Sequence, residues 1–131
     1  MAGGLGLATA GTSEAAVPTQ VSAASTSTVY NFGLTTTQAK YVQCWLNYWD
    51  FGNLTVDGEL GTASWKAFQR ELTQYWGYTG AIDGIPGTNT IKALQRLLKA
   101  NWGYTGAIDG EAGSGTQAAF SRFANNNSGM C

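Results

Sequence analysis

A nine-residue phrase occurs twice in this chain without change, and the two copies lie 26 residues apart. Trp-Gly-Tyr-Thr-Gly-Ala-Ile-Asp-Gly fills 76–84 and again 102–110, and Val56-Asp57-Gly58 gives a weaker third copy at the same spacing upstream. A short fixed period indicates one supersecondary unit used several times, and a unit this small cannot bury an apolar face alone. The chain is therefore predicted to fold as an array of similar units.

Each unit contains one segment with the apolar spacing of an amphipathic helix. These segments lie near 37–49, 62–75, 88–102 and 114–125. The side chains expected to face the core are Val42, Trp45, Leu46 and Trp49 in the first, Trp65, Phe68 and Leu72 in the second, Ile91, Leu94, Leu97 and Leu98 in the third, and Phe120 and Phe123 in the last. The sequence predicts an all-α fold, a small bundle of about four short helices built from 26-residue helix–loop repeats.

The connections are too rich in glycine to be helical. Asp83-Gly84 and Asp109-Gly110 are expected to form Asx-type turns with glycine at positive φ, which is a better explanation of these aspartates than calcium binding. Ile82 and Ile108 are expected to plug the core from the loops. For the third helix, Thr88 or Thr90 is expected to supply the N-cap and Gly103 to end the helix.

Composition divides the chain into three parts: a leader at 1–33, the repeat domain at 34–125, and a C-terminal tail at 126–131. Residues 1–29 are mostly small or hydroxyl-bearing and carry a single charge, Glu14. An apolar stretch at 2–10 resembles the end of a signal peptide with cleavage near Ala10 or Ala16, although no basic region precedes it. The leader is thus either a truncated signal peptide or a disordered tail.

The composition excludes several classes of function. A net charge of −1, with 11% charged residues, gives no basic field for nucleic acid or an anionic membrane, and no apolar run is long enough to span one. The absence of histidine removes the commonest general base and zinc ligand. Glu59, Glu71 and Glu111 occupy different repeat positions and form no evident glycosidase pair. We therefore expect no catalysis, no metal and no cofactor.

The chain has two cysteines, Cys44 and Cys131. Cys44 takes the repeat position of Arg70 and Arg96, which is expected to be a solvent-facing helix position. A surface thiol and a thiol at the C-terminus favour an intramolecular disulfide in an oxidising compartment. Two free thiols, or pairing between chains, are the alternatives.

Several elements in fixed order resemble the peptidoglycan-binding domain 1 family over about 37–125. They are Lys92-Ala93-Leu94-Gln95, Gly103-Tyr104, Asp109-Gly110, Gly113, Thr116 and Ala119-Phe120, with an overlapping set that begins at Lys66-Ala67-Phe68-Gln69. The resemblance implies small three-helix bundles, usually appended to cell-wall hydrolases, that hold these enzymes on peptidoglycan. The repeated nine-residue sequence looks like versions from secreted proteins of Gram-positive bacteria and their phages. The first unit departs from the pattern, with Asp50-Phe51-Gly52-Asn53-Leu54 in place of Trp-Gly-Tyr-Thr-Gly, and Ser121 stands where a glutamine is expected.

The predicted ligand-binding residues are Trp76, Tyr78, Trp102, Tyr104, Gln69, Gln95, Arg70 and Arg96. A flat aromatic face at a helix end or loop can lie against a sugar ring. The tyrosines are expected to be exposed, whereas the tryptophans either bind ligand or cap the bundle as core. The glutamine amides either donate to glycan hydroxyls and peptide carbonyls or tie down the following loop. The arginines either pair with carboxylates of the peptide stem or lie on solvated helix faces.

The predicted function is a secreted, cell-wall-associated, non-catalytic protein that binds the glycan or the peptide stem of peptidoglycan as a monomer. The alternative is a structural or interaction protein whose repeat scaffold meets a separate protein partner. A wall-lytic enzyme, or a fragment of one, is a third hypothesis, which the lack of histidine disfavours.

Overall fold

The computed structural model describes residues 28–131, and this part of the chain is all-α with no strand. Its elements are α1 (Thr36–Tyr48), α2 (Thr62–Tyr75), α3 (Thr88–Asn101), α4 (Ser114–Asn126) and a short 3-10 helix, η2 (Ser128–Met130). Each α-helix starts 26 residues after the previous one, which confirms the predicted class and helix positions. Within 28–131, no helix combines the length and the apolar character needed to cross a membrane. The predicted cleavage positions lie outside the described residues.

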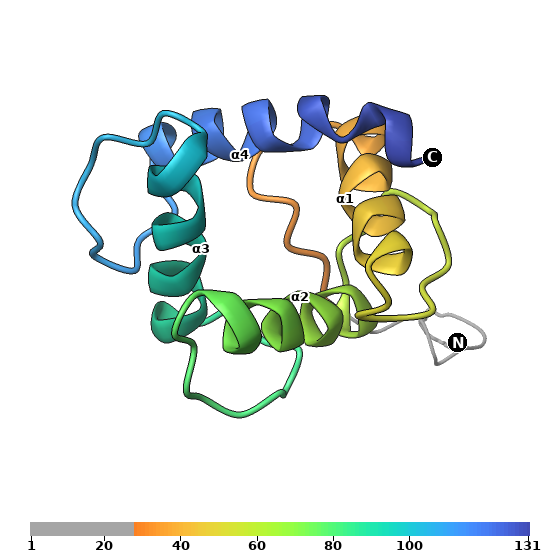
Figure 1. The fold of residues 1–131 in the computed structure, drawn as a ribbon, viewed down its shortest axis with the longest axis horizontal. Helices are drawn as coiled ribbons and strands as arrows, with labels where there is room; N and C mark the ends of the chain where they lie inside the picture. Colours follow the sequence, from red (N-terminus) through yellow and green to blue (C-terminus); the bar gives the residue numbers. More distant parts are fainter. Residues whose placement is uncertain (1–27) are drawn as a thin grey trace, which may run out of the picture.

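The four helices form a closed ring. In Figure 1 they follow the sides of a square, and the loops between them project outward. Each helix packs against the next one in sequence, and α4 packs against α1, which closes the ring. The segment before α1 crosses from α2 to α4, because the Tyr30 amide donates to the Leu60 carbonyl (2.9 Å) and Gly33 lies against Gln117. The predicted boundaries at 33/34 and 125/126 therefore fall inside the packed body.

Aromatic side chains fill the interior of the ring. Trp65 and Phe68 of α2 are stacked with ring centroids 5.4 Å apart, and Phe68 meets Phe120 of the opposite helix α4 at 6.0 Å. The apolar residues expected to face the core from α2, α3 and α4 are all buried. Such burial contributes roughly 1.5–3 kcal/mol for each large side chain. The core thus joins helices across the ring as well as around it.

Three local predictions were wrong. Trp49 is 55% exposed, because α1 ends at Tyr48 and the helical spacing no longer governs the next residue. Ile82 is exposed, although Ile108 packs against the core as expected. The N-cap of α3 is Gly87 and makes no side-chain bond, because the Thr90 hydroxyl instead accepts from the amide of Gln69 at 3.1 Å.

A glycine at positive φ fixes the path of each loop. Gly84 has a φ of 76°, and the Cβ of any other residue there would lie 2.7 Å from the carbonyl oxygen of Thr62, at the start of α2. Gly58 and Gly110 repeat this contact against the first residues of α1 and α3. Each loop therefore folds back along its preceding helix, and only glycine allows so close an approach.

We expect Gly84→Ala to lower the free energy of unfolding by roughly 2 kcal/mol, because it adds both backbone strain and a clash with a backbone oxygen. Urea unfolding followed by circular dichroism measures the change. Gly87→Ala is the matched control, since nothing lies within 4 Å of the added Cβ, and it should change stability by less than about 1 kcal/mol. Equal effects of the two variants would contradict the assigned loop path.

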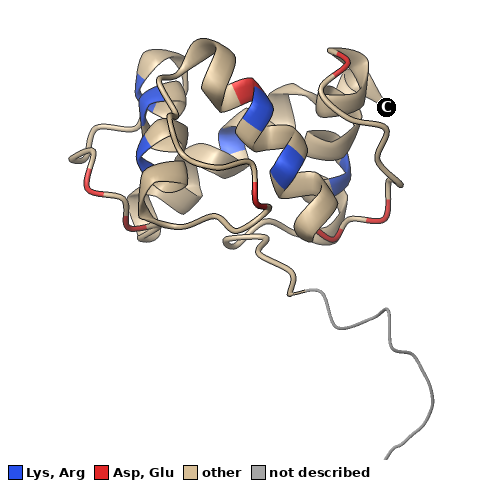
Figure 2. Cartoon of the chain, turned by 90° about the horizontal axis from the view of Figure 1, so that it is seen from below, with Lys and Arg blue, Asp and Glu red and all other residues tan. Residues whose placement is uncertain are grey.

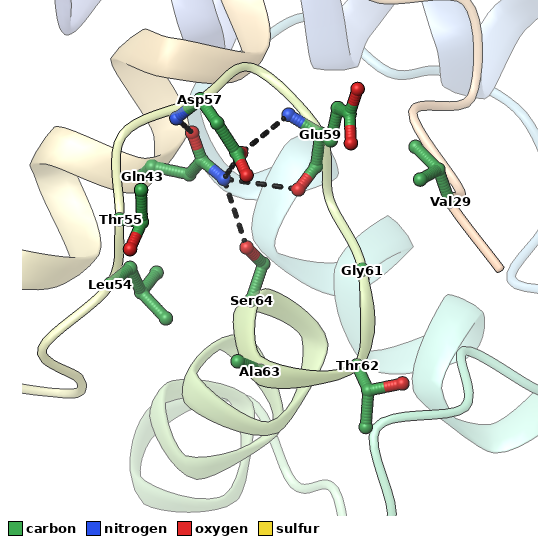
Figure 3. A pocket seen from close by; sticks show the side chains of 10 residues that line it. All are labelled: Val29, Gln43, Leu54, Thr55, Asp57, Glu59, Gly61, Thr62, Ala63 and Ser64. Atoms are coloured by element: carbon green, nitrogen blue, oxygen red, sulfur yellow. Dashed lines mark hydrogen bonds between the residues drawn. The ribbon is translucent and has the colours of Figure 1, made fainter. Parts of the chain in front are cut away.

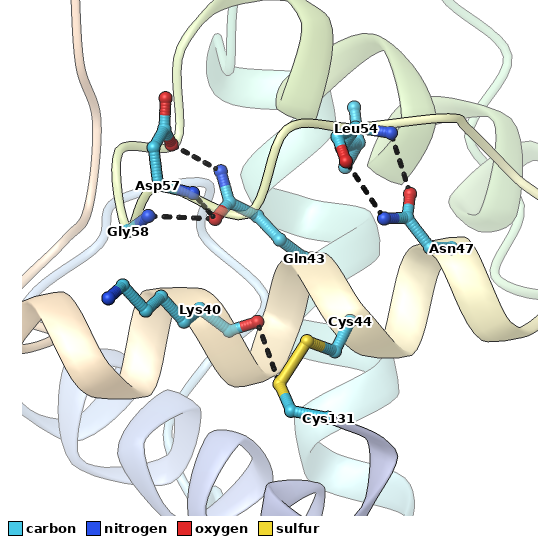
Figure 4. Close-up of a disulfide and its surroundings, with 8 residues drawn as sticks. All are labelled: Lys40, Gln43, Cys44, Asn47, Leu54, Asp57, Gly58 and Cys131. Atoms are coloured by element: carbon cyan, nitrogen blue, oxygen red, sulfur yellow. Dashed lines mark hydrogen bonds between the residues drawn. A yellow bond between two sulfur atoms is a disulfide. The ribbon is translucent and has the colours of Figure 1, made fainter.

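An arginine fastens α2, α3 and α4 each to the chain at the end of the preceding helix. The bonds run from Nε of Arg70 to the carbonyl of Phe51 (2.9 Å), of Arg96 to that of Trp76 (2.7 Å), and of Arg122 to that of Trp102 (2.8 Å). In α1 the same repeat position holds Cys44, which forms a disulfide with Cys131 just beyond α4 (Figure 4). The predicted pairing is present, and it links α1 to the helix that precedes it around the ring.

Loss of this disulfide should lower stability by about 4 kcal/mol, because it closes a long loop in the unfolded chain. The two cysteines are 87 residues apart in sequence. The measurement is urea unfolding of the wild type with and without a reductant, beside the double variant Cys44→Ser with Cys131→Ser. The reductant should have no effect on the double variant. Unchanged stability in either experiment would show that helix packing alone closes the ring.

Candidate functional site

A buried glutamine ties each loop to the preceding helix. Nε2 of Gln69 donates to Oδ1 of Asp83 (3.0 Å) and to the carbonyl of Ile85 (3.1 Å), and its Oε1 accepts from the amide of Gly84 (2.8 Å). Gln43 and Gln95 make the same bonds in their own units. Gln69 and Gln95 have no exposed surface, so the structure commits both predicted site residues to holding loops.

The predicted exposure of Tyr78 and Tyr104 was wrong, since these side chains are only 5% and 7% exposed. The Tyr78 hydroxyl donates to the carbonyl of Ala81 (2.6 Å) and accepts from Gln69 (3.3 Å). A Cβ at Gly80 would lie 2.6 Å from this hydroxyl, so the glycine leaves room for the loop to cover the ring. Both tyrosine side chains therefore lie inside their loops and bind the loop backbone through their hydroxyl groups.

The remaining predicted residues are divided between packing and the surface. Trp76 and Trp102 are half-buried and pack against the core, and Trp102 meets Phe123 edge-on at 5.6 Å. Arg96 is half-buried and Arg70 exposed, and each uses its Nε to fasten a neighbouring helix. The eight predicted residues therefore do not come together as a single site.

Two hollows recur at the same repeat positions, where a loop meets the start of the next helix. The first has a volume of about 370 Å³ and is lined by Asp57, Glu59 and Ser64, as Figure 3 shows. The other measures about 490 Å³ and is lined by the equivalent residues Asp109, Glu111 and Thr116. In both, a carboxylate and a hydroxyl surround a space open to solvent. We call these the loop hollows.

A third hollow of about 550 Å³ lies between the C-terminal ends of α1 and α2. Its lining includes Trp45, Trp49, Phe51, Arg70, Glu71 and Tyr75, and we call it the aromatic pocket. Trp49 and Tyr75 remain 55% and 60% exposed, so large flat faces are open to solvent at its rim. Of the residues predicted to bind ligand, only Arg70 lines this pocket.

Glu71 differs from the other charged residues of the described chain because its side chain is buried. Figure 2 shows Lys and Arg on the helices and the acidic residues mainly on the loops, and Glu71 is the one acid inside a helix within 28–131. It is only 4% exposed; Oε2 accepts from Nε1 of Trp76 (3.1 Å), whereas Oε1 is buried without a partner. Burial raises the pKa of Glu71 to about 7, and the bond from Trp76 opposes this only in part.

The pKa values of the turn aspartates are shifted in the opposite direction, below their usual value. Oδ1 of Asp83 accepts from the amide of Ile85 (3.0 Å) and from Gln69, and these bonds hold the pKa of Asp83 below its usual value. The amides of Gln43 and Gln95 are the main cause of the same lowering of pKa at Asp57 and Asp109. The expected Asx-type turns are thus present. Within the described residues, no three His, Cys, Asp or Glu side chains lie together as a metal site.

In residues 28–131 the structure is thus a closed helical repeat that carries the loop hollows and the aromatic pocket. Comparisons of the chain with protein-family models, with curated proteins and with solved structures found no match.

Stability should be greatest near about pH 5 and fall on both sides. The pKa of Glu71 is raised by burial from its ordinary value of 4.5 to about 7, so the folded state loses up to about 3 kcal/mol of stability as the pH rises from 4.5 to about 7. The pKa values of Asp57, Asp83 and Asp109 are lowered, so the stability that they contribute is lost as the pH falls below about 4.

Urea unfolding across this pH range tests the assignment. Glu71→Gln should remove most of the fall between about pH 4.5 and 7 and leave the acid side unchanged. Glu111→Gln, which alters an exposed carboxylate, is the control and should retain the fall. A Glu71→Gln profile identical to that of the wild type would contradict the assignment to Glu71.

Proposed function

We propose that this chain is a secreted, non-catalytic protein that binds peptidoglycan, the repeating glycan and peptide polymer of bacterial cell walls. The observation that carries the proposal is the pair of loop hollows with equivalent linings on one ring. A polymer of repeating chemistry offers the same group many times, so equivalent sites on one body can engage it together. Linked sites raise overall affinity well above that of either alone.

The lining of the loop hollows supports a sugar or peptide ligand. Glu59 and Glu111 contribute carboxylates that accept hydrogen bonds from hydroxyl and amide groups, and both side chains are exposed. The nearby Asp57 and Asp109 are held by Gln43 and Gln95, which keeps the walls of the hollows fixed. Preorganised walls lower the entropy lost when a ligand binds.

The disulfide supports the proposed location. Such bonds form and persist in oxidising compartments, including the exterior of the cell. The pair Cys44–Cys131 closes the ring and is therefore part of the folded architecture. A protein that works in the cell wall would meet these conditions.

We expect the purified full chain to sediment with intact peptidoglycan sacculi. The double variant Glu59→Ala with Glu111→Ala should bind roughly tenfold more weakly, because it removes an acceptor from each loop hollow. Ile85→Ala is the matched control, since Ile85 is the exposed residue at the same repeat position in the other loop, and it should bind as the wild type does.

Failure of the wild type to sediment above the level of an unrelated disulfide-bonded protein would refute the proposal. Self-association in size-exclusion chromatography, together with such a failure, would favour a structural protein instead. Equal binding by the wild type and the double variant would place the contact outside the loop hollows.

A further inference from the structure

We propose that the aromatic pocket is a separate subsite for one sugar ring, with Trp49 and Tyr75 as its stacking faces and Glu71 as its hydrogen-bond acceptor. The pocket is distinct from both loop hollows in sequence and in lining. The choice of a saccharide rests on the proposed peptidoglycan-binding function. The location of the site rests on the geometry of the pocket alone.

The repeat provides an internal comparison for Glu71. Its equivalents in the other helices are Trp45, Leu97 and Phe123, and all of these are apolar and at least half-buried. A carboxylate in such a position costs folding free energy that an apolar side chain would not. The bond from Trp76 satisfies only one of the two carboxylate oxygens, so a functional role is the expected reason for this departure from the repeat.

The bonding of Glu71 is incomplete without a ligand. Trp76 donates to one carboxylate oxygen, and the other is buried with no donor in reach. Buried polar groups nearly always have a partner, so an unpaired oxygen beside an open pocket calls for an external donor. A sugar hydroxyl, or the N–H of an acetamido group, supplies such a donor without adding charge.

The residue at one rim position of the pocket differs from its repeat equivalents. Asp50 stands at the repeat position of Trp76 and Trp102, whose side chains pack against the core in the later units. The small Asp50 lines the pocket and leaves the space between α1 and α2 unfilled. The first unit thus departs from the repeated sequence at a residue that lines the pocket.

The shape and chemistry of the pocket suit a pyranose ring. Trp49 and Tyr75 offer broad exposed faces for the apolar face of a sugar, while the carboxylate of Glu71 and the guanidinium of Arg70 meet its polar edge. The bond from Arg70 to the carbonyl of Phe51 holds that guanidinium in place. A volume of about 550 Å³ accommodates a small ligand.

The test is titration of the full chain with the soluble tetramer of N-acetylglucosamine, followed by NMR of the indole N–H signals. The chain has five tryptophans, so each signal can be assigned. The signal of Trp49 should shift, whereas that of the fully buried Trp65 should not. Trp49→Ala should weaken binding at least tenfold without changing thermal stability, because its side chain is exposed.

Glu71→Leu is the decisive variant, since it restores the residue that the repeat has at Leu97. It should lose most of the sugar binding and unfold at a higher temperature, a combination that a purely structural role for Glu71 does not produce. Ile85→Ala is the control and should bind the sugar normally. Sugar binding by Glu71→Leu that equals that of the wild type would overturn the assignment.

Parallel sedimentation with sacculi separates this inference from the proposed function. Sacculi binding without any shift at Trp49 would overturn the subsite and leave the proposed function standing. A shift at Trp49 without sacculi binding would support the subsite and refute peptidoglycan as the target. A parallel titration with n-butylammonium tests whether the pocket binds an organic cation and not a sugar. Shifts caused by this cation but not by the sugar would overturn the saccharide assignment.

Discussion

The side-chain amide of one buried glutamine is the interaction on which the rest of this structure depends. Gln69 gathers an aspartate, two backbone groups and two hydroxyls into one network, and Gln95 does the same in the next unit. Gln43 makes the equivalent network in the first unit with one hydroxyl. An amide can both donate and accept, so one side chain satisfies both kinds of group in a loop that lacks regular backbone pairing. Because the Gln69 side chain at the centre of this network is fully buried, it ties the glycine-rich loop to the packed helices. The walls of the loop hollows exist only because of it.

The helices and the disulfide could be predicted from the sequence, whereas the exposure of several aromatic residues could not. The 3.6-residue spacing places Ile91 and Leu94 on one face of a helix wherever the neighbouring helices lie, and both are buried. Trp49 fits the same spacing but follows the last helical residue, so its exposure depends on where the chain turns. Tyr78 lies in a segment whose glycines suggest an open loop, yet those glycines are what allow the loop to close over its ring. Periodicity describes regular elements, and it says little about the residues at their ends.

The candidate site had a sequence signal of a different kind. Glu71 shares its repeat position with Leu97 and Phe123, so alignment of the units alone marks it as an acid among core residues. What the alignment does not reveal is that one carboxylate oxygen would remain without a partner, or that Asp50 would leave an open space beside it. Both facts depend on how α1 and α2 meet in three dimensions. Departures from a repeat therefore indicate where to look, and the packing shows what is there.

The covalent bond between Cys44 and Cys131 has a consequence for whether helices can be exchanged between copies of the chain. Open solenoids expose an apolar face at each extremity, which permits further units or other molecules to add there and obliges the terminal repeats to become polar. Here the last helix meets the first, so neither extremity is left uncovered. The disulfide occupies the repeat position that holds an arginine in α2, α3 and α4. A hydrogen bond from arginine could form equally with a helix of another copy, whereas the covalent bond joins α1 to the C-terminus of its own chain. Within residues 28–131, the four helices of one chain are thereby held in a closed ring, and exchange of α4 between copies is prevented for as long as the surroundings stay oxidising.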